Sequence, residues 1–545
     1  MNDIAIDFVK ERSLDVEKIL NSKHPRKVVV AGPGTGKSYL FEQAIKKKKA
    51  EGKSNFLAIT FIGKLGDSLA DDLAGMANAM TLHGFARKFL LSIYPSSWIY
   101  YPDISNIIMQ DLELNGSRTT SVLDPEYKKR TIYYRAFGDD DIIGYALKVL
   151  KKNSDRIPKY DLILVDEFQD FNETEAEFID ILATKNEVLV VGDDDQALYE
   201  FKGSSPKFIR NKFSTSNKDF EGHTLRFCSR CTQTIVTAFH DIVTAFGLNT
   251  KEKDRIQKEY LCYLPQKKED NLLNPSIVLL SDVGPGQIPF KIESELSNIL
   301  QNQKVKTVLV IGEGRSCKGM LSDVALKLKE MGFRNVHHGA QGSMFTFKKN
   351  LYEGYKILQK GKNDLLAWRL IVEEMDIPTK EKLIINHFKD PAGFIQNIPM
   401  AFKKEHEKNA VTLNTILRKS KSVRDYIAES SIEKLKKQLV IEKMSERELL
   451  MSQLIVENGH IPRPLANLDI TVCNILGAKG LGADVVFLIG FDEKKLPMND
   501  PVKNSEVYQM LVALTRAKKR IYLINTKNKK ISRFMNYINK NGGAT

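Results

Sequence analysis

Short runs of consecutive apolar residues alternate with longer stretches of mixed polarity along the first part of the chain. The runs are Val28–Val30, Phe56–Ile59, Leu162–Val165 and Val188–Val191. A short apolar run between polar turn residues is typical of a strand that is buried on both faces, and the stretches between these runs have helical character. This alternation predicts a parallel, doubly wound α/β sheet.

A second set of apolar runs predicts a second α/β core of similar type. The hydrophobic pattern of Leu321–Met331 predicts a helix between the strand that begins at Val308 and a short strand near Val336. The runs of this second set are Ile277–Leu280, Val308–Ile311, Ile470–Val472, Val485–Ile489 and Ile521–Ile524.

Two stretches fit neither sheet. One is mixed and polar, and the other is rich in Lys and Glu with helical periodicity. Both interrupt an α/β core, so we interpret them as inserted, mainly helical subdomains. The predicted division is residues 1–89 and 159–212 for the first core, 90–158 for the first insertion, 213–344 and 465–545 for the second core with a basic tail, and 345–464 for the second insertion.

Composition narrows the class of protein. The chain has 545 residues, which is too long for one core. No apolar run reaches the ~18 residues that cross a bilayer, and five cysteines do not form a disulfide framework at this length. Cys228 and Cys231 form a lone CxxC with no second pair at zinc spacing, so we interpret it as structural. These features predict a cytoplasmic protein that does not contact membranes.

The net charge of +14 is compatible with a polyanionic partner. The alternative is that lysine runs such as Lys46–Lys49 are only solvated helix faces. Charge alone does not decide between them.

The segment AGPGTGKS at Ala31–Ser38 follows a predicted strand and precedes a predicted helix. In that context a glycine-rich loop cradles phosphate oxygens with its backbone N–H groups, whereas elsewhere it is only a turn. Lys37 would reach the β- and γ-phosphates, and Ser38 would hold Mg²⁺. The candidate nucleotide-binding residues are Gly32, Pro33, Gly34, Thr35, Gly36, Lys37, Ser38 and the adjacent Tyr39, which could offer an aromatic face to a base.

Five more candidates complete a triphosphate site. Asp166 and Glu167 follow a strand, at the sheet edge where α/β folds bind ligands. Asp166 would hold Mg²⁺ and Glu167 would orient or deprotonate the attacking water. Gln196 follows the strand Val188–Val191 and could sense a γ-phosphate. Arg230 and Arg516 are candidate arginine fingers.

Tyr199 and Phe201 follow Gln196 at alternate positions. If the backbone is extended there, both side chains point the same way. Aromatic residues at such spacing are usually core, but beside a nucleotide sensor they suit stacking on the bases of single-stranded nucleic acid.

The order and wording of these segments resemble the UvrD/PcrA/Rep branch of superfamily-one helicases. DEFQD at Asp166–Asp170 is similar to the second helicase motif of that branch. The segments LAITFIGK at Leu57–Lys64, TLHGFARKFL at Thr81–Leu90 and LGAKGLGADVVFLIG at Leu476–Gly490 resemble further motifs.

This resemblance implies two RecA-like cores, called 1A and 2A, with ATP and Mg²⁺ between them and insertions called 1B and 2B. It also implies that single-stranded DNA lies across both cores and that the enzyme moves 3′→5′. The residues that the resemblance assigns to DNA are Phe61, Lys64, His83, Tyr199, Phe201 and Lys202.

The chain departs from the family pattern where the nucleoside is read. No glutamine stands in Ser13–Leu20, Ser229 takes the place of a tyrosine, and Gly482 takes the place of a glutamate. We therefore expect looser nucleobase selectivity or a different base contact, with Tyr39 as a candidate. The alternative is that Tyr39 packs in the core and a glutamine elsewhere reads the base.

The leading functional prediction is an ATP-driven 3′→5′ single-stranded DNA translocase and helicase. The alternative is a DNA-stimulated regulatory ATPase that licenses a partner nuclease, because compact UvrD-like chains of bacterial anti-phage systems of the Gabija type are similar. A binding scaffold without ATPase activity is disfavoured, since no triphosphate-contacting residue is missing.

Overall fold

The computed structural model describes residues 8–61, 69, 71, 73, 75–118, 121–214, 216–248, 255–264, 276–314, 316–338, 345–389, 393–419, 440–443 and 463–538. The chain forms two compact units. The first, here called the core unit, comprises Met1–Leu82, Leu150–Gln341 and Leu454–Thr545. The second, the insertion unit, comprises His83–Val149 and Gly342–Gln453.

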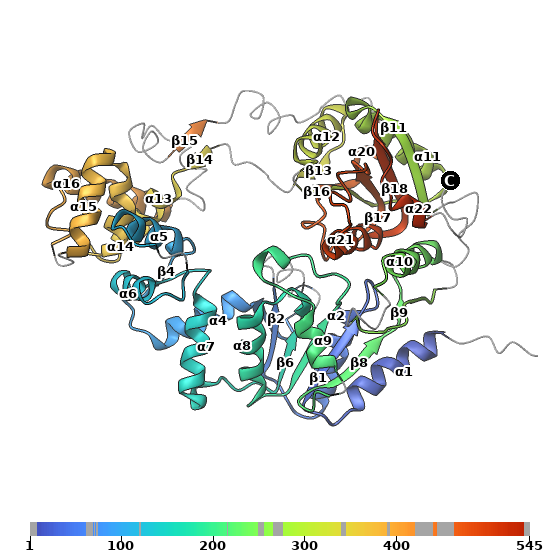
Figure 1. Ribbon diagram of the computed structural model, residues 1–545, viewed down its shortest axis with the longest axis horizontal. Coiled ribbons are helices and arrows are strands. Elements are labelled where there is room, and N and C mark those ends of the chain that lie inside the picture. The colour runs from blue at the N-terminus through green and yellow to red at the C-terminus, as the bar shows by residue number, and fades with distance from the viewer. Residues whose placement is uncertain are drawn as a thin grey trace, which may run out of the picture. The chain divides into compact units, whose positions relative to one another are not determined.

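A parallel six-stranded sheet organises the first half of the core unit (Figure 1), in the order β3-β2-β6-β7-β1-β8. One face packs against α1 and α2, because alternate strand residues such as Val29 and Ala31 point into the same apolar cluster as Leu40 and Ile45. The strands are β1 (Arg26–Ala31), β2 (Phe56–Thr60), β3 (Asn78–Thr81), β6 (Leu162–Val165), β7 (Val188–Gly192) and β8 (Glu221–Leu225); the helices are α1 (Phe8–Asn21), α2 (Lys37–Ala50), α8 (Glu173–Ala183) and α9 (Lys207–Phe213).

A second parallel sheet has the order β11-β18-β17-β12-β16-β13. Val308 and Val310 of β12 lie in one apolar cluster with α11 and α12, whereas Leu309 and Ile311 lie in another with α10 and α21. The sheet is thus covered on both faces, as its continuous apolar strands predict. Its strands are β11 (Ile277–Val283), β12 (Thr307–Gly312), β13 (Asn335–His338), β16 (Asp469–Asn474), β17 (Ala483–Ile489) and β18 (Ala517–Thr526); the helices are α10 (Gln233–Ala245), α11 (Ile288–Asn302), α12 (Lys318–Met331), α20 (Arg463–Ala466), α21 (Asn504–Leu514) and α22 (Met535–Ile538).

The two sheets confirm the predicted class, α/β with two parallel-sheet cores. Every apolar run predicted as a strand lies in a strand, and the predicted helix lies within α12. The predicted start of the second core at residue 213 is too early, because β8 pairs with β1 and so belongs to the first sheet. Its sequence EGHTL is short and weakly apolar because an edge strand has one strand neighbour and is only partly buried.

The insertion unit is mainly helical, as expected, and its two chain segments share one apolar core. Ile104 and Ile108 of α5 belong to the same buried cluster as Leu351 of α13 and Trp368 of α14. The helices are α4 (Leu82–Ile93), α5 (Ile104–Leu114), α6 (Pro125–Tyr134), α7 (Ile142–Lys152), α13 (Lys349–Leu358), α14 (Leu365–Ile371), α15 (Ile377–Lys389) and α16 (Met400–Lys419); short strand pairs are β4 (Ile99–Tyr100) with β5 (Ala136–Phe137) and β14 (Phe345–Phe347) with β15 (Val440–Lys443).

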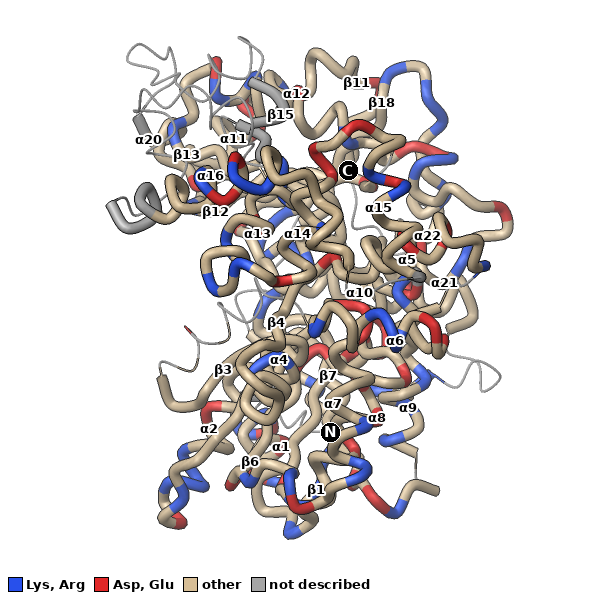
Figure 2. The backbone as a smooth tube through the Cα atoms, turned by 90° about the vertical axis from the view of Figure 1, so that its left-hand side faces the viewer, with Lys and Arg blue, Asp and Glu red and all other residues tan. Residues whose placement is uncertain are grey.

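Basic and acidic residues are interspersed along most of the described backbone (Figure 2). The lysine run of α2 has intramolecular partners: Lys46 pairs with Glu42, and Lys48 pairs with Glu51 and Glu187. These pairs offset part of the positive charge of this run within the chain. The five cysteines are free thiols. Among the described residues, no helix combines the length and the apolar character needed to span a bilayer.

Candidate active site

The loop between β1 and α2 is held in a tight, glycine-dependent conformation. Gly34 and Gly36 have φ values of 70° and 95°, which glycine adopts at low cost. A Cβ atom on Gly34 would lie 2.4 Å from Cβ of Arg230, so a side chain there would collide. The Thr35 hydroxyl donates to the Gly32 carbonyl at 2.8 Å. The loop leads into the N-terminus of α2, where N–H groups and the helix dipole suit anionic oxygens.

The carboxylates after β6 lie beside this loop. Lys37 Nζ donates to Glu167 Oε1 at 2.8 Å, and Glu167 has a left-handed backbone with φ of 51°. Burial alone would raise the pKa of Glu167, but the ammonium groups of Lys37 and Lys479 outweigh it and hold that pKa below its usual range. Burial raises the pKa of Asp166 to about 6 against the attraction of Lys37.

Gln196 and Arg516 meet directly. Arg516 is 2% exposed, and its Nη2 donates to Gln196 Oε1 at 3.1 Å. Its other nitrogens donate to the carbonyls of Val512 and Leu481, both at 3.0 Å. Burial, reinforced by the charge of Arg230, lowers the pKa of Arg516 to about 10. The backbone contacts therefore fix this guanidinium in place.

The segment that carries Arg230 rests on the glycine-rich loop. Ser229 donates to the Gly34 carbonyl through both its backbone N–H, at 2.9 Å, and its hydroxyl, at 3.0 Å. A Cβ atom on Gly482 would lie 3.1 Å from Arg230 Nε. Two of the three positions that depart from the family pattern thus contact the loop or the arginine, and Gly482 leaves room for that arginine.

These groups line a cavity of about 400 Å³, within the usual size range for a ligand site. Sequence reasoning missed three of its lining residues, Leu69, Gly480 and Lys518. The described lining is Pro33, Gly34, Gly36, Lys37, Ser38, Leu69, Asp166, Glu167, Gln196, Ser229, Arg230, Gly480, Arg516 and Lys518.

Lys479 is a further residue that sequence reasoning missed. Its side chain is 1% exposed, and its Nζ donates to the Gln196 carbonyl at 2.7 Å, to the Asp170 carboxylate, and lies 3.7 Å from Glu167 Oε2. The available signal in the sequence was the position of this lysine within the glycine-rich segment LGAKGLG. If it is buried there, it needs carboxylate partners.

Comparison with models of known protein families identifies the family of this chain. Residues 109–217 match the UvrD/REP helicase N-terminal domain, and residues 227–528, more than half of the 545-residue chain, match the UvrD-like helicase C-terminal domain. The chain belongs to the UvrD-like helicase family.

Several relatives of this UvrD-like helicase match over nearly its full length, and others match a shorter stretch. "DNA helicase II" of Rickettsia typhi is 22% identical over 94% of this chain and 93% of its own. "Probable DNA helicase II homolog" of Mycoplasma genitalium is 22% identical over 94% of this chain and 85% of its own. One component of an "ATP-dependent helicase/nuclease" of Streptococcus mutans is 27% identical over 30% of this chain and 14% of its own.

A cluster of aromatic side chains lies beside the cavity of this UvrD-like helicase. The Tyr199 ring is 8% exposed and packs 5.1 Å from the Phe61 ring. Lys202 Nζ lies 6.0 Å from the Phe61 ring. The expected extended backbone is wrong, because Glu200–Lys202 forms a 3₁₀ turn.

Among the other predicted DNA-contact residues, the structure describes the side chain of His83. His83 lies on α4 and is half-buried in the insertion unit. Lys64 and the side chain of Phe201 lie outside the described residues. The DNA contacts of all six residues remain predictions.

Tyr39 lies next to an arginine that sequence reasoning did not consider. The Arg12 guanidinium lies 5.2 Å from the Tyr39 ring and 5.1 Å from the Tyr263 ring, and its Nη1 donates to the Tyr263 hydroxyl at 2.9 Å. Its Nη2 would be 2.8 Å from a Cβ atom on Gly36. Because Tyr39 is 44% exposed, it does not pack in the core. This arginine and the two tyrosines form a polar aromatic cluster at the end of the glycine-rich loop.

Proposed function

We propose that this UvrD-like helicase hydrolyses ATP in the 400 Å³ cavity and uses that energy to move 3′→5′ along single-stranded DNA. One observation carries the proposal: five segments that are distant in sequence place Lys37, Asp166, Glu167, Gln196, Arg230 and Arg516 around one cavity. That set contains a cationic phosphate contact, two carboxylates, an amide and two guanidinium groups, as phosphoryl transfer to water requires.

Each side chain has a distinct part in the proposed reaction. Lys37 would bind the β- and γ-phosphates, which compete with Glu167 for its ammonium group. Glu167 would then accept the proton of the water that attacks the γ-phosphorus, as the bond to the β-phosphate oxygen breaks. Arg230 and Arg516 would stabilise the negative charge of the transferred group.

Ser38 and Asp166 offer the oxygen donors that Mg²⁺ accepts, and both line the cavity. When bound, the ion would neutralise phosphate charge. Asp166 is positioned for this by its own neighbour, since the backbone N–H of Glu167 donates to Asp166 Oδ1 at 2.9 Å.

The experiment is ATP turnover measured with and without single-stranded DNA, together with unwinding of duplexes that carry a 3′ or a 5′ tail. Single-stranded DNA should stimulate turnover, and the stimulation should fall steeply with salt because phosphate contacts release counterions. Only the 3′-tailed duplex should be unwound. Equal unwinding of both duplexes would contradict the polarity.

Two variants test the site itself. Lys37→Ala should weaken ATP binding because it removes the phosphate contact. Glu167→Gln should retain binding, measured with a fluorescent ATP analogue, and lose hydrolysis. Lys212→Met, which alters a buried lysine that pairs with Asp180 and does not line the cavity, serves as the control. Near-normal ATPase activity in both site variants would refute the assignment.

A second candidate function is a regulatory ATPase that licenses a partner nuclease. The partial match to a component of the "ATP-dependent helicase/nuclease" of Streptococcus mutans favours it. In that case DNA-stimulated ATPase activity would persist while tailed duplexes are not unwound, and a nuclease encoded next to this chain would become active only in its presence.

A further inference from the structure

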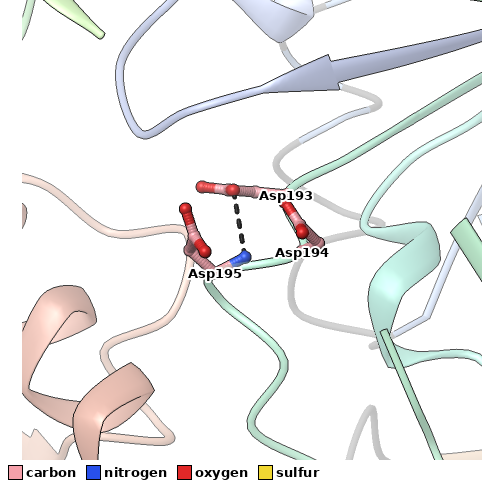
Figure 3. Close-up of side chains that lie close together, drawn as sticks. All are labelled: Asp193, Asp194 and Asp195. Atoms are coloured by element: carbon pink, nitrogen blue, oxygen red, sulfur yellow. Dashed lines mark hydrogen bonds between the residues drawn. The ribbon is translucent and has the colours of Figure 1, made fainter. Parts of the chain in front are cut away.

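Three consecutive aspartates that follow β7 are completely buried. Asp193, Asp194 and Asp195 place carboxylate oxygens within 4.8 Å of one another (Figure 3). Such a group could hold a metal ion, but here an ammonium group takes the central position. Lys258 Nζ lies 2.6 Å from Asp193, 2.7 Å from Asp194 and 2.8 Å from Asp195.

The other two cations of the cluster are divided among the carboxylates. Arg255 donates to both oxygens of Asp195 at 2.7 Å, and Arg210 donates to Asp194 at 2.9 Å. Among the described ion pairs, Asp193 is held by Lys258 alone. Both partners of that pair are desolvated, with side chains 1% and 0% exposed. Removing Lys258 would leave Asp193 as a buried charge without its counterion.

Asp193 connects this buried cluster to the candidate site by a hydrogen bond. Its second oxygen accepts a hydrogen bond from Gln196 Nε2 at 2.5 Å. An amide has its donor and acceptor on opposite sides, so this bond fixes the direction of Gln196 Oε1, which accepts from Arg516 at 3.1 Å. The contacts therefore run without a break from Lys258 through Asp193 and Gln196 to Arg516.

A second branch leads from the same aspartate to Glu167. The backbone N–H of Asp193 donates to Gln169 Oε1 at 2.9 Å, and Gln169 Nε2 donates to Glu167 Oε2 at 2.5 Å. Gln169 is fully buried, so its amide has a single arrangement that satisfies both partners.

We propose that Lys258 is a positioning residue for ATP hydrolysis, which orients Gln196 and Glu167 by holding Asp193. This inference rests on the proposed function of the cavity. Lys258 does not line the cavity, and it belongs to a segment that also supports the glycine-rich loop, since the Tyr260 hydroxyl donates to the Pro33 carbonyl at 2.8 Å.

The first test is Lys258→Met in the full chain, compared with Lys212→Met, which removes another buried lysine that pairs with an aspartate and does not line the cavity. Lys258→Met should lower kcat for DNA-stimulated ATP hydrolysis on the order of 10- to 100-fold, because misplacement of catalytic groups slows the chemical step, while KM changes little. The control should keep wild-type kcat. Wild-type kcat in Lys258→Met, in a protein whose Lys37→Ala variant is inactive, would overturn the inference and leave the proposed function standing.

A double-mutant cycle separates positioning from general loss of structure. If Lys258 acts through Gln196 and Glu167, Lys258→Met should cost much less in kcat when Gln196→Ala and Gln169→Ala are already present. A structural role would give the same loss in both backgrounds, and would overturn the inference.

Asp193→Asn keeps the test decisive if Lys258→Met does not fold. The asparagine is isosteric and leaves Lys258 with two aspartates. To keep its oxygen on Lys258, it must turn its NH₂ group toward Gln196 Nε2, which would force the Gln196 amide to flip away from Arg516. We expect a drop in kcat similar to that of Lys258→Met with unchanged nucleotide binding; wild-type kcat would overturn the inference.

Discussion

At the scale of single residues, two neighbouring ammonium groups control how readily the Glu167 carboxylate accepts a proton. Lys37 lies 2.8 Å from one of its oxygens and Lys479 lies 3.7 Å from the other. If a γ-phosphate engages Lys37, Glu167 loses its closer cation and becomes a better base. With the proposed function, the pairing would thus link proton acceptance to phosphate binding.

The two arginines should differ from ordinary surface arginines in their effect on turnover. Arg230→Ala or Arg516→Ala should lower DNA-stimulated kcat by a factor on the order of 10³ or more, as expected for a group that stabilises the transferred phosphate. Arg520→Ala, which alters an arginine that contacts the Tyr522 hydroxyl, is the control. A loss below about tenfold in both site variants would remove the arginines from the mechanism.

Nucleobase selectivity is a second residue-scale prediction. Since no glutamine stands in Ser13–Leu20 to read the base, the polar aromatic cluster made by Arg12, Tyr39 and Tyr263 is the candidate contact, and selectivity for ATP over GTP and CTP should be weak. Comparison of kcat/KM for the three nucleotides in wild type, Tyr39→Ala and Arg12→Ala measures it. A preference for ATP above about a hundredfold that survives both substitutions would show that other residues read the base.

At the scale of elements, Tyr199, which precedes the 3₁₀ turn Glu200–Lys202, lies between the cavity and the aromatic ring of Phe61. Tyr199, just before the turn, packs on Phe61 and lies 5.8 Å from Lys479 Nζ. Because Lys479 also contacts the Gln196 carbonyl, a displacement of the Tyr199 ring would reach the site through one side chain.

Substitutions in this turn and at the residue before it should separate DNA binding from coupling. Phe201→Ala should weaken binding of single-stranded DNA by about 1–3 kcal/mol if a base stacks on that ring. Tyr199→Ala should retain ATP hydrolysis and lose movement along DNA. Fluorescence anisotropy measures the first, and translocation to a labelled 5′ end measures the second; unchanged DNA affinity in Phe201→Ala would contradict stacking.

At the scale of the whole molecule, the two insertions form one folded unit. Arg369 of α14 donates to Asp111 of α5 at 2.7 Å, and the Tyr134 hydroxyl donates to the same carboxylate at 2.5 Å. Both members of this ion pair are at most 1% exposed. Segments that are 258 residues apart in the chain therefore depend on one another for stability.

The chain offers a selective probe of that unit. Its two tryptophans, Trp98 and Trp368, both belong to the insertion unit. Asp111→Ala leaves Arg369 buried without this partner and should destabilise the unit by about 3–5 kcal/mol, measured by urea unfolding followed through tryptophan fluorescence. The double variant Asp111→Leu with Arg369→Met should recover much of the loss. Equal stability of wild type and Asp111→Ala would show that the pair contributes nothing.

The sequence by itself determined the strands, the glycine-rich loop and the residues that follow the strand ends. These features are local: a strand that is buried on both faces must be apolar along its length, and a loop with positive φ at Gly34 and Gly36 requires glycine. The first-core strands β3 and β8 were not predicted, because both are edge strands that are only partly buried and their patterns are weak.

Only the tertiary structure decided which charges meet. Lys258 and Arg12 stand in segments with no distinctive pattern, and Lys479 stands in a recognisable glycine-rich segment that does not indicate its partners. Each becomes informative through partners up to about 300 residues away in the chain. The shared apolar core of the two insertions was likewise visible only in the tertiary structure. Burial selects residue types, but pairing depends on where the chain returns in space, and a periodic pattern of apolar residues carries no record of that return.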